Sequence, residues 1–153
     1  MTIRYTAIKA IQTQLETILI SNGYNYDLGA NVFIGIPRLD PSFDEFISMW
    51  PGVDEKNDNG FYAKWQFAIE LKIEACKEIS KESDDMELIS QNMLSDVVKC
   101  LHKPSITGID NSNIFYTGGG IETYPQPGET VLGVVANYEL NYNTAAGDLT
   151  TNI

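Results

Sequence analysis

The chain contains 153 residues, of which 43% are hydrophobic, and this is enough for one hydrophobic core and one domain. Asp and Glu together number 21 against 10 for Lys and Arg, and the formal charge of -11 argues against tight binding to nucleic acid, because negative side chains repel phosphates. No stretch approaches the roughly 20 consecutive apolar residues of a membrane-spanning helix, and the first residues lack the apolar segment of a signal peptide. We therefore expect one acidic domain that is made and used inside a cell, away from membranes.

The first predicted element is a helix within residues 3–22. Its apolar side chains recur at intervals of three and four, which places them on one helical face. They are Ile8, Ile11, Leu15, Ile18 and Leu19. Asn22 and Gly23 favour the left-handed conformation that ends a helix.

Two short strands and a loop are predicted next. Residues 31–36 form a β-rich run that ends at Pro37, and a weaker run over residues 43–50 ends at Pro51. Residues 54–60 are charged and turn-forming, which predicts a solvated loop.

A long strand and a second helix follow. Apolar and polar residues alternate from Trp65 to Ile73, which is typical of a strand with one buried and one solvated face. The helix is expected to begin near Asp84, with Glu87 completing a capping box, and to end before Pro104. Its apolar stripe consists of Met86, Ile89, Met93, Leu94, Val97, Val98 and Leu101.

The last third of the chain predicts two more strands. Residues 113–116 favour a short strand that the glycines at 118–120 break, and residues 123–128 form a Pro/Gly loop. Alternation over residues 132–142 then predicts a second long strand. Residues 143–153 are small and polar, so we expect a flexible C-terminal tail after a single domain of residues 1–142.

This element order predicts an α+β fold with a mixed or antiparallel β-sheet and two amphipathic helices packed on one face. The other face of the sheet would remain solvated. Long strands also create sheet edges, which a protein must blunt, cover or pair with a neighbour.

Side chains with catalytic potential are few. His102 is the single histidine and lies at the end of the second predicted helix beside Lys103, where a positive charge stabilises the helix dipole. Cys76 and Cys100 lie far apart, and no HExxH or CxxC spacing is present, so we interpret both as small buried residues. We predict no catalytic residue, no cofactor and no metal, and hence no enzyme.

Two glycine-containing segments resemble ligand loops only in part. Glycines 118–120 lack the Lys-Ser/Thr of a phosphate loop and favour a bend or bulge between strands. Residues 55–60 resemble a calcium loop, but Glu55 replaces the usual first Asp and Gln66 the usual final Glu, so a hydrated turn is preferred. Trp50 and Trp65 are core candidates, although Trp50 beside a proline could also anchor an interface.

Residues 18–35 read ILISNGYNYDLGANVFIG. This segment resembles the opening of bacteriophage tail terminators and related minor tail proteins, in which an N-terminal helix leads through a Gly and an Asp-Leu-Gly turn into the first strand. The later order of a long strand, an amphipathic helix and a final long strand after a Pro/Gly loop also resembles that family. Where the family often has a compact second strand flanked by prolines, this chain departs from the pattern, since it has the segment from Pro41 to Pro51 and then a long acidic loop.

The resemblance implies a structural virion protein that assembles into a ring, typically a hexamer. Such a ring caps the tail tube at its head-proximal end, stops tube elongation and provides the head-tail joining surface. Its partners would be further copies of itself, the tail tube protein and the head-completion or neck proteins, while DNA passes through the lumen without specific binding. The protein would be made in the host cytoplasm and reside in the virion tail.

In this interpretation the exposed loops and the tail contact neighbouring subunits, the tube or the neck. The candidate assembly residues are Asp54, Glu55, Asp58, Gly118, Gly119, Tyr124, Asn143 and Asp148. The alternatives are another neck component, such as a head-tail connector or tail-completion protein, or a small ligand- or metal-binding module.

Overall fold

The computed structural model describes residues 1–35, 43–57, 63–79, 85–102, 106–107, 113–123, 125 and 130–151. The elements in chain order are α1 (Ile3–Leu15), two 3-10 turns η1 (Ile20–Asn22) and η2 (Leu28–Ala30), β1 (Val32–Ile34), β2 (Glu45–Asn57), β3 (Lys64–Glu78), α2 (Met86–Leu101), β4 (Ile114–Thr123) and β5 (Val131–Ala145). The strands form one mixed sheet in the order β1-β2-β3-β5-β4. Among the described strands, β1 and β2 are parallel, and the other three neighbouring pairs are antiparallel.

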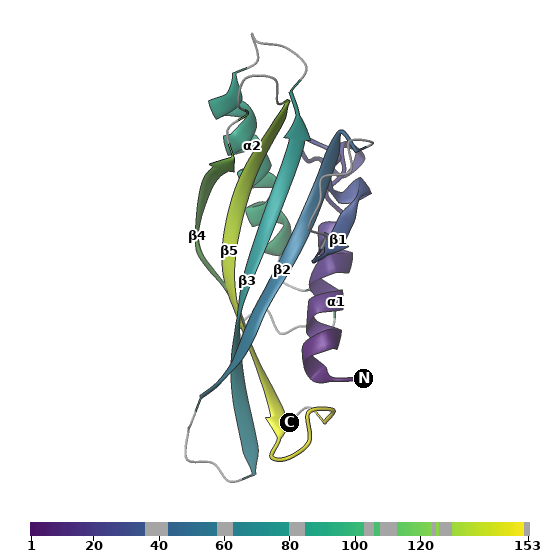
Figure 1. The fold of residues 1–153 in the computed structure, drawn as a ribbon. Coiled ribbons are helices and arrows are strands. Elements are labelled where there is room, and N and C mark those ends of the chain that lie inside the picture. The colour runs from purple at the N-terminus through teal and green to yellow at the C-terminus, as the bar shows by residue number, and fades with distance from the viewer. Residues whose placement is uncertain are drawn as a thin grey trace.

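Both helices lie on the same side of this sheet (Figure 1). The predicted stripe residues Ile8, Ile11 and Leu15 of α1 are buried, and they share one core cluster with Met93 and Val97 of α2. Alternate residues of the two long strands complete that core, among them Ile69, Leu71 and Ile73 of β3 and Leu132, Val134 and Leu140 of β5. The predicted α+β fold with two amphipathic helices on one sheet face is therefore confirmed.

The second helix begins one residue later than predicted. Asp85 is the N-cap of α2, and its Oδ1 accepts a hydrogen bond of 3.1 Å from the backbone N-H of Leu88. Asp84, which the sequence suggested as the cap, lies outside the described residues. The first helix ends earlier than predicted, since Gly23 (φ +84°) terminates the turn η1 and α1 itself stops at Leu15.

Strand β2 is longer than predicted. It continues through Pro51 to Asn57, so residues 54–57 belong to a strand and the prediction of a loop there is wrong. The pairing with β3 shifts by one residue between Pro51 and Asp54, which is a β-bulge. Strand β1 pairs only with residues 47–49 of β2, so beyond Met49 the outer side of β2 has no neighbouring strand among the described residues. Because proline has no N-H to donate, Pro51 fits this free edge beside a bulge and does not end the strand. Residues 58–60 of the predicted loop lie outside the described residues.

Strand β4 also differs from the prediction. The glycines at 118–120 do not break it, since β4 runs from Ile114 to Thr123 and pairs with β5 through all three. The register shifts between Tyr116 and Gly118, and Gly118 has a φ of +150°, so the predicted bulge is present inside the strand. The following strand, β5, extends to Ala145, three residues beyond its predicted end.

Candidate assembly surface

The sheet face that is turned away from the two helices carries no helix or strand among the described elements (Figure 1). We call it the open face. It carries the alternate positions of the long strands, and polar residues stand opposite one another across β3 and β5. These pairs are Gln66 with Asn143, Glu70 with Glu139, and Lys72 with Asn137. The prediction that one side of the long strands is polar is confirmed for this part of the sheet.

One end of the open face is more apolar than the sequence suggested. Phe46, Ser48, Cys76 and Val135 are all buried there, although they project away from the helix-facing core. Both cysteines are free thiols and both are buried, in agreement with the sequence interpretation. Burial raises the pKa of the Cys76 thiol to about 12, and the neighbouring Glu74 carboxylate adds to the effect.

A hollow of about 620 Å³ lies in the middle of the open face. Four strands contribute to it, and the residues around it include Trp50, Glu70, Lys72, Thr117, Asn137 and Glu139. Glu70 and Glu139 are direct cross-strand partners, and among the described residues neither forms an ion pair. Like charges placed opposite each other destabilise a strand pair, so this arrangement is costly for the isolated domain.

Lys72 at the same hollow is engaged elsewhere, since its Nζ lies 2.6 Å from Oε1 of Glu122 on β4. This ion pair ties the edge strand to the centre of the sheet. It is partly exposed on both sides, so we expect only a small contribution to stability.

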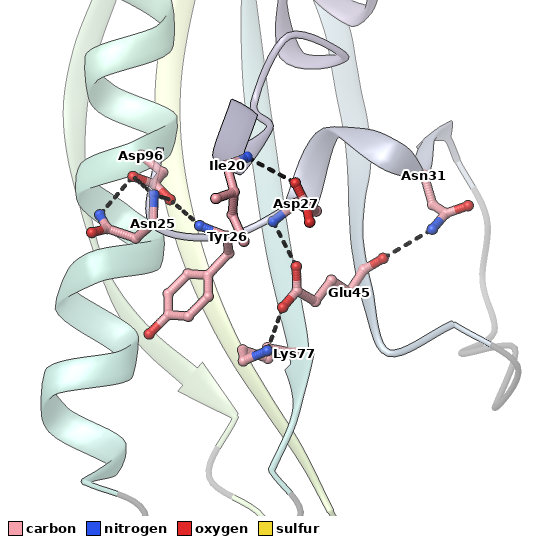
Figure 2. Close-up of polar contacts among 8 residues, drawn as sticks. All are labelled: Ile20, Asn25, Tyr26, Asp27, Asn31, Glu45, Lys77 and Asp96. Atoms are coloured by element: carbon pink, nitrogen blue, oxygen red, sulfur yellow. Dashed lines mark hydrogen bonds and ion pairs between the residues drawn. The ribbon is translucent and has the colours of Figure 1, made fainter. Parts of the chain in front are cut away.

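The segment that resembles tail terminators is held in place by acidic side chains (Figure 2). Asp96 of α2 is only 1% exposed, and its carboxylate accepts hydrogen bonds from the backbone N-H groups of Asn25 (2.9 Å) and Tyr26 (3.1 Å) and from the side-chain amide of Asn25 (2.8 Å). These donors satisfy a buried charge that would otherwise be very costly. The same bonds fix residues 25 and 26 against α2.

The Asp-Leu-Gly turn has a structural explanation of the same kind. Asp27 accepts a hydrogen bond of 2.8 Å from the backbone N-H of Ile20, and its own N-H donates to Glu45, which is paired with Lys77 (Figure 2). Leu28 is fully buried. A Cβ atom on Gly29 would lie 2.5 Å from the carbonyl oxygen of Leu15, so only glycine lets this turn approach the end of α1.

The candidate assembly residues fall into two groups. The first group lies at one end of the sheet and consists of Asp54 and Glu55 in β2, Asn143 in β5, and Asp148 in the turn after β5. A hydrogen bond from the Ala146 N-H to the Ala63 carbonyl attaches that turn to the start of β3. Gly118 and Gly119 lie in β4, at the opposite edge of the sheet. The structure therefore does not bring all of them together, and Asp58 and Tyr124 lie outside the described residues.

Asp54 takes part in an internal contact as well. The Nε of Arg4 lies 2.7 Å from its Oδ1, and the Nη2 of Arg4 donates a 2.6 Å hydrogen bond to the carbonyl of Gly52. The Asp54 carboxylate also bonds Tyr142, and burial together with this negative neighbour raises the pKa of the Tyr142 hydroxyl to about 12. Arg4 thus attaches the first turn of α1 to the bulge of β2.

Sequence reasoning missed two kinds of residue. The first is Asp96, which is next to Val97 on the buried face of α2. A carboxylate among the apolar residues of a helix could have been interpreted as a buried hydrogen-bond acceptor. The alternation over residues 132–142 places Glu139 on the polar side of its strand. That Glu139 lies opposite Glu70 depends on the register between β3 and β5, which no local pattern specifies.

The described residues contain no group of three His, Cys, Asp or Glu side chains that could hold a metal ion. Neither of their two helices is long and apolar enough to cross a membrane. His102 follows the last residue of α2, where its N-H bonds the carbonyl of Val98. Residues 55–60 resemble a calcium loop only in part, and a hydrated turn was predicted there. Glu55 to Asn57 instead continue strand β2, and the next three positions lie outside the described residues.

Comparison with known proteins found no protein-family model that matches the chain and no curated protein that matches it.

Proposed function

We propose that this chain is a structural subunit of a bacteriophage tail, a tail terminator that assembles into a ring at the head-proximal end of the tail tube. In this role it contacts copies of itself, the tail tube protein and the head-completion or neck proteins. It stops tube elongation and presents the surface to which the head is joined.

The open face is the observation that carries the proposal. A ring subunit needs one face that borders the lumen and another that supports the fold, and here both helices cover one side of the sheet. The uncovered side presents amides and carboxylates, including Asn137, Glu139 and Asn143. Two carboxylates at its hollow form no ion pair among the described residues. Negative charge repels phosphate, so a lumen lined in this way lets DNA slide without binding.

The architecture of residues 18–35 supports the same proposal. The segment leads from the end of α1 through the Asp27 turn into β1, as the resemblance to tail terminators implies. The later order of long strand, helix and final long strand also agrees with that resemblance.

Electron microscopy of particles that lack the protein tests the proposal. Loss of a terminator should give tails of uncontrolled length or tubes that carry no head, and supplying the wild-type protein should restore joined tails of uniform length. Tubes of normal length that fail to join heads would instead indicate another neck component. Joined tails of normal length in the absence of the protein would overturn both assignments.

A further inference from the structure

Exposed apolar side chains occur at both edges of the sheet. On one side β1 covers only residues 47–49 of β2, and we call the free part of β2 beyond Met49 the β2 edge. Val53 lies in the bulge of this edge and is 83% exposed. At the β4 edge, Phe115 and Tyr116 are 48% and 45% exposed. Other apolar side chains, such as Ile20 and Leu88, are also exposed, but singly, which is normal for a protein surface. What distinguishes Val53, Phe115 and Tyr116 is their position at the two edges where a neighbouring sheet would make contact.

The two apolar sites lie in the same cross-strand row. Phe115 is the partner of Glu139, and Glu139 is the partner of Glu70. On the other side, the β2 partners of Ile69 and Leu71 are Asp54 and Pro51. Glu70, which lies between Ile69 and Leu71, is therefore opposite the bulge that contains Val53. If a second molecule is placed with its β4 edge beside the β2 edge of the first, and is not shifted along the strand direction, its Phe115 therefore lies level with Val53 of the first molecule.

The edges are poorly suited to a continuous backbone ladder. At the β2 edge, Pro51 has no N-H to donate and the carbonyl of Gly52 already accepts a bond from Arg4. Strand β4 has register shifts on both sides of its glycines. Prolines and bulges are the devices that prevent strand addition, so contact at these edges must rely on side chains.

The charges around both sites are balanced apart from two carboxylates. Around Val53 the two acidic residues Asp54 and Glu55 are matched in number by Arg4 and Lys56. Glu70 beside Val53 and Glu139 beside Phe115 form no ion pair among the described residues. The only charged residue of β4 is Glu122, and it is paired with Lys72. Because the whole chain has a net charge of -11, two copies repel each other least where the local charge is balanced.

We propose that a second copy of this chain docks its β4 edge, through Phe115 and Tyr116, against the β2 bulge at Val53 of the first copy. The inference rests on the self-association in the proposed function and specifies its surfaces. The two surfaces are different and lie at opposite edges of one sheet, so the contact is head-to-tail. A head-to-tail contact closes into a ring when the rotation between neighbours divides a full turn, and it keeps every open face on the same side of the wall.

Two charge variants used separately and mixed test this arrangement. Val53→Glu disables the β2 edge and leaves the β4 edge intact, whereas Phe115→Glu does the reverse. Each variant alone should be a monomer at concentrations at which the wild type assembles, as measured by light scattering. An equimolar mixture should give dimers and nothing larger, because each pair retains one intact contact. Both variants add the same charge, so no new salt bridge can explain the mixed dimer.

The control is Leu88→Glu, which adds the same charge at an exposed position in the first turn of α2 and should assemble like the wild type. All three variants should melt within a few degrees of the wild type, since the replaced side chains are exposed. If wild type assembles and either edge variant still does so, the edge assignment is wrong while the ring stands. If the variants are monomers and their mixture is too, the contact is not between β4 and β2. A wild type that remains a monomer at every concentration rejects the ring and this contact together.

Discussion

Single buried groups determine how the connecting segment between α1 and β1 is held. Asp96 is almost completely enclosed, yet its carboxylate meets three donors from residues 25 and 26. The backbone N-H groups of that segment have no strand or helix to pair with, so the side chain replaces the secondary structure that they lack.

Replacement of Asp96 by Ala should leave two backbone N-H groups without an acceptor. We expect a loss of about 3 kcal/mol in the free energy of unfolding, because each buried unsatisfied donor costs roughly 1 to 3 kcal/mol. Urea denaturation followed by circular dichroism measures the change. Ser95→Ala, at the exposed neighbouring position, should change stability by less than about 0.5 kcal/mol. Equal stabilities for the two variants would show that the Asp96 bonds are unimportant.

The buried thiol of Cys76 predicts a loss of stability in alkali. Its pKa rises from 9.0 to about 12 on folding, so the unfolded chain releases the proton at a lower pH than the folded protein does. The contribution of the protonated thiol to the free energy of unfolding is therefore complete below pH 9 and declines as the pH rises towards 12. Near pH 10.5 the free energy of unfolding should be lower by about 2 kcal/mol than at neutral pH. Urea denaturation of wild type and Cys76→Ala at about pH 8 and about pH 10.5 tests this. The variant should lose less stability between the two conditions, and identical losses would contradict the assignment.

At the scale of the elements, the glycines of β4 have different tasks. A Cβ atom on Gly119 would lie 2.4 Å from the carbonyl oxygen of Val135, whereas one on Gly120 would meet nothing within 4 Å. Gly119 is therefore required for the close approach of β4 to β5, and Gly120 is not. The sequence contains three adjacent glycines and could not distinguish them, because the distinction depends on how much space the neighbouring chain leaves for a Cβ atom at each one.

The pair of variants Gly119→Ala and Gly120→Ala tests this difference. Gly119→Ala should lower the free energy of unfolding by about 2 kcal/mol through overpacking against the neighbouring strand. Gly120→Ala should be close to neutral or slightly stabilising, since alanine loses less backbone entropy on folding than glycine. Thermal unfolding monitored by circular dichroism compares them. A greater loss for Gly120→Ala would mean that the pairing of β4 and β5 is different.

The elements that alternate or repeat over many residues were predictable, and the boundaries set by tertiary contacts were not. Both helices and both long strands follow from apolar spacing, because burial against one shared core imposes that spacing. Pro51 and Gly118 were interpreted as strand breaks. Each instead sits beside a register shift that lets the strand continue, and whether a strand can tolerate such a shift depends on the strand next to it.

At the scale of the whole molecule, the helices divide the sheet into a supported side and an open side. The sequence predicted a solvated face, but it could not show that the candidate residues at positions 54 and 118 lie at opposite edges. That separation arises from the strand order, which places β2 near one edge and β4 at the other. Long-range pairing of this kind is not encoded in any local pattern.

Reversing charge on the open face tests whether DNA passes along it. The double variant Glu70→Lys and Glu139→Lys places two positive charges at the hollow, where they should hold phosphates. Particles assembled with this variant should release DNA slowly, with a drop in infectious titre on the order of tenfold or more. The control, Glu16→Lys with Glu87→Lys, makes the same change in net charge at two exposed positions, one just after α1 and one in the first turn of α2. Equal titres for the two double variants would place the lumen elsewhere.

The backbone bond from Ile3 N-H to the Leu149 carbonyl, 3.0 Å long, brings the beginning of α1 and the turn after β5 together at one end of the molecule (Figure 1). Arg4, one residue further on, touches the carbonyl of Gly52 beside Val53. An affinity tag or fluorescent protein attached before Met1 or after Thr151 would therefore emerge next to the same proposed contact. Moving a fusion from one terminus to the other is then not an independent control, and oligomer measurements call for protein from which the fusion has been cleaved.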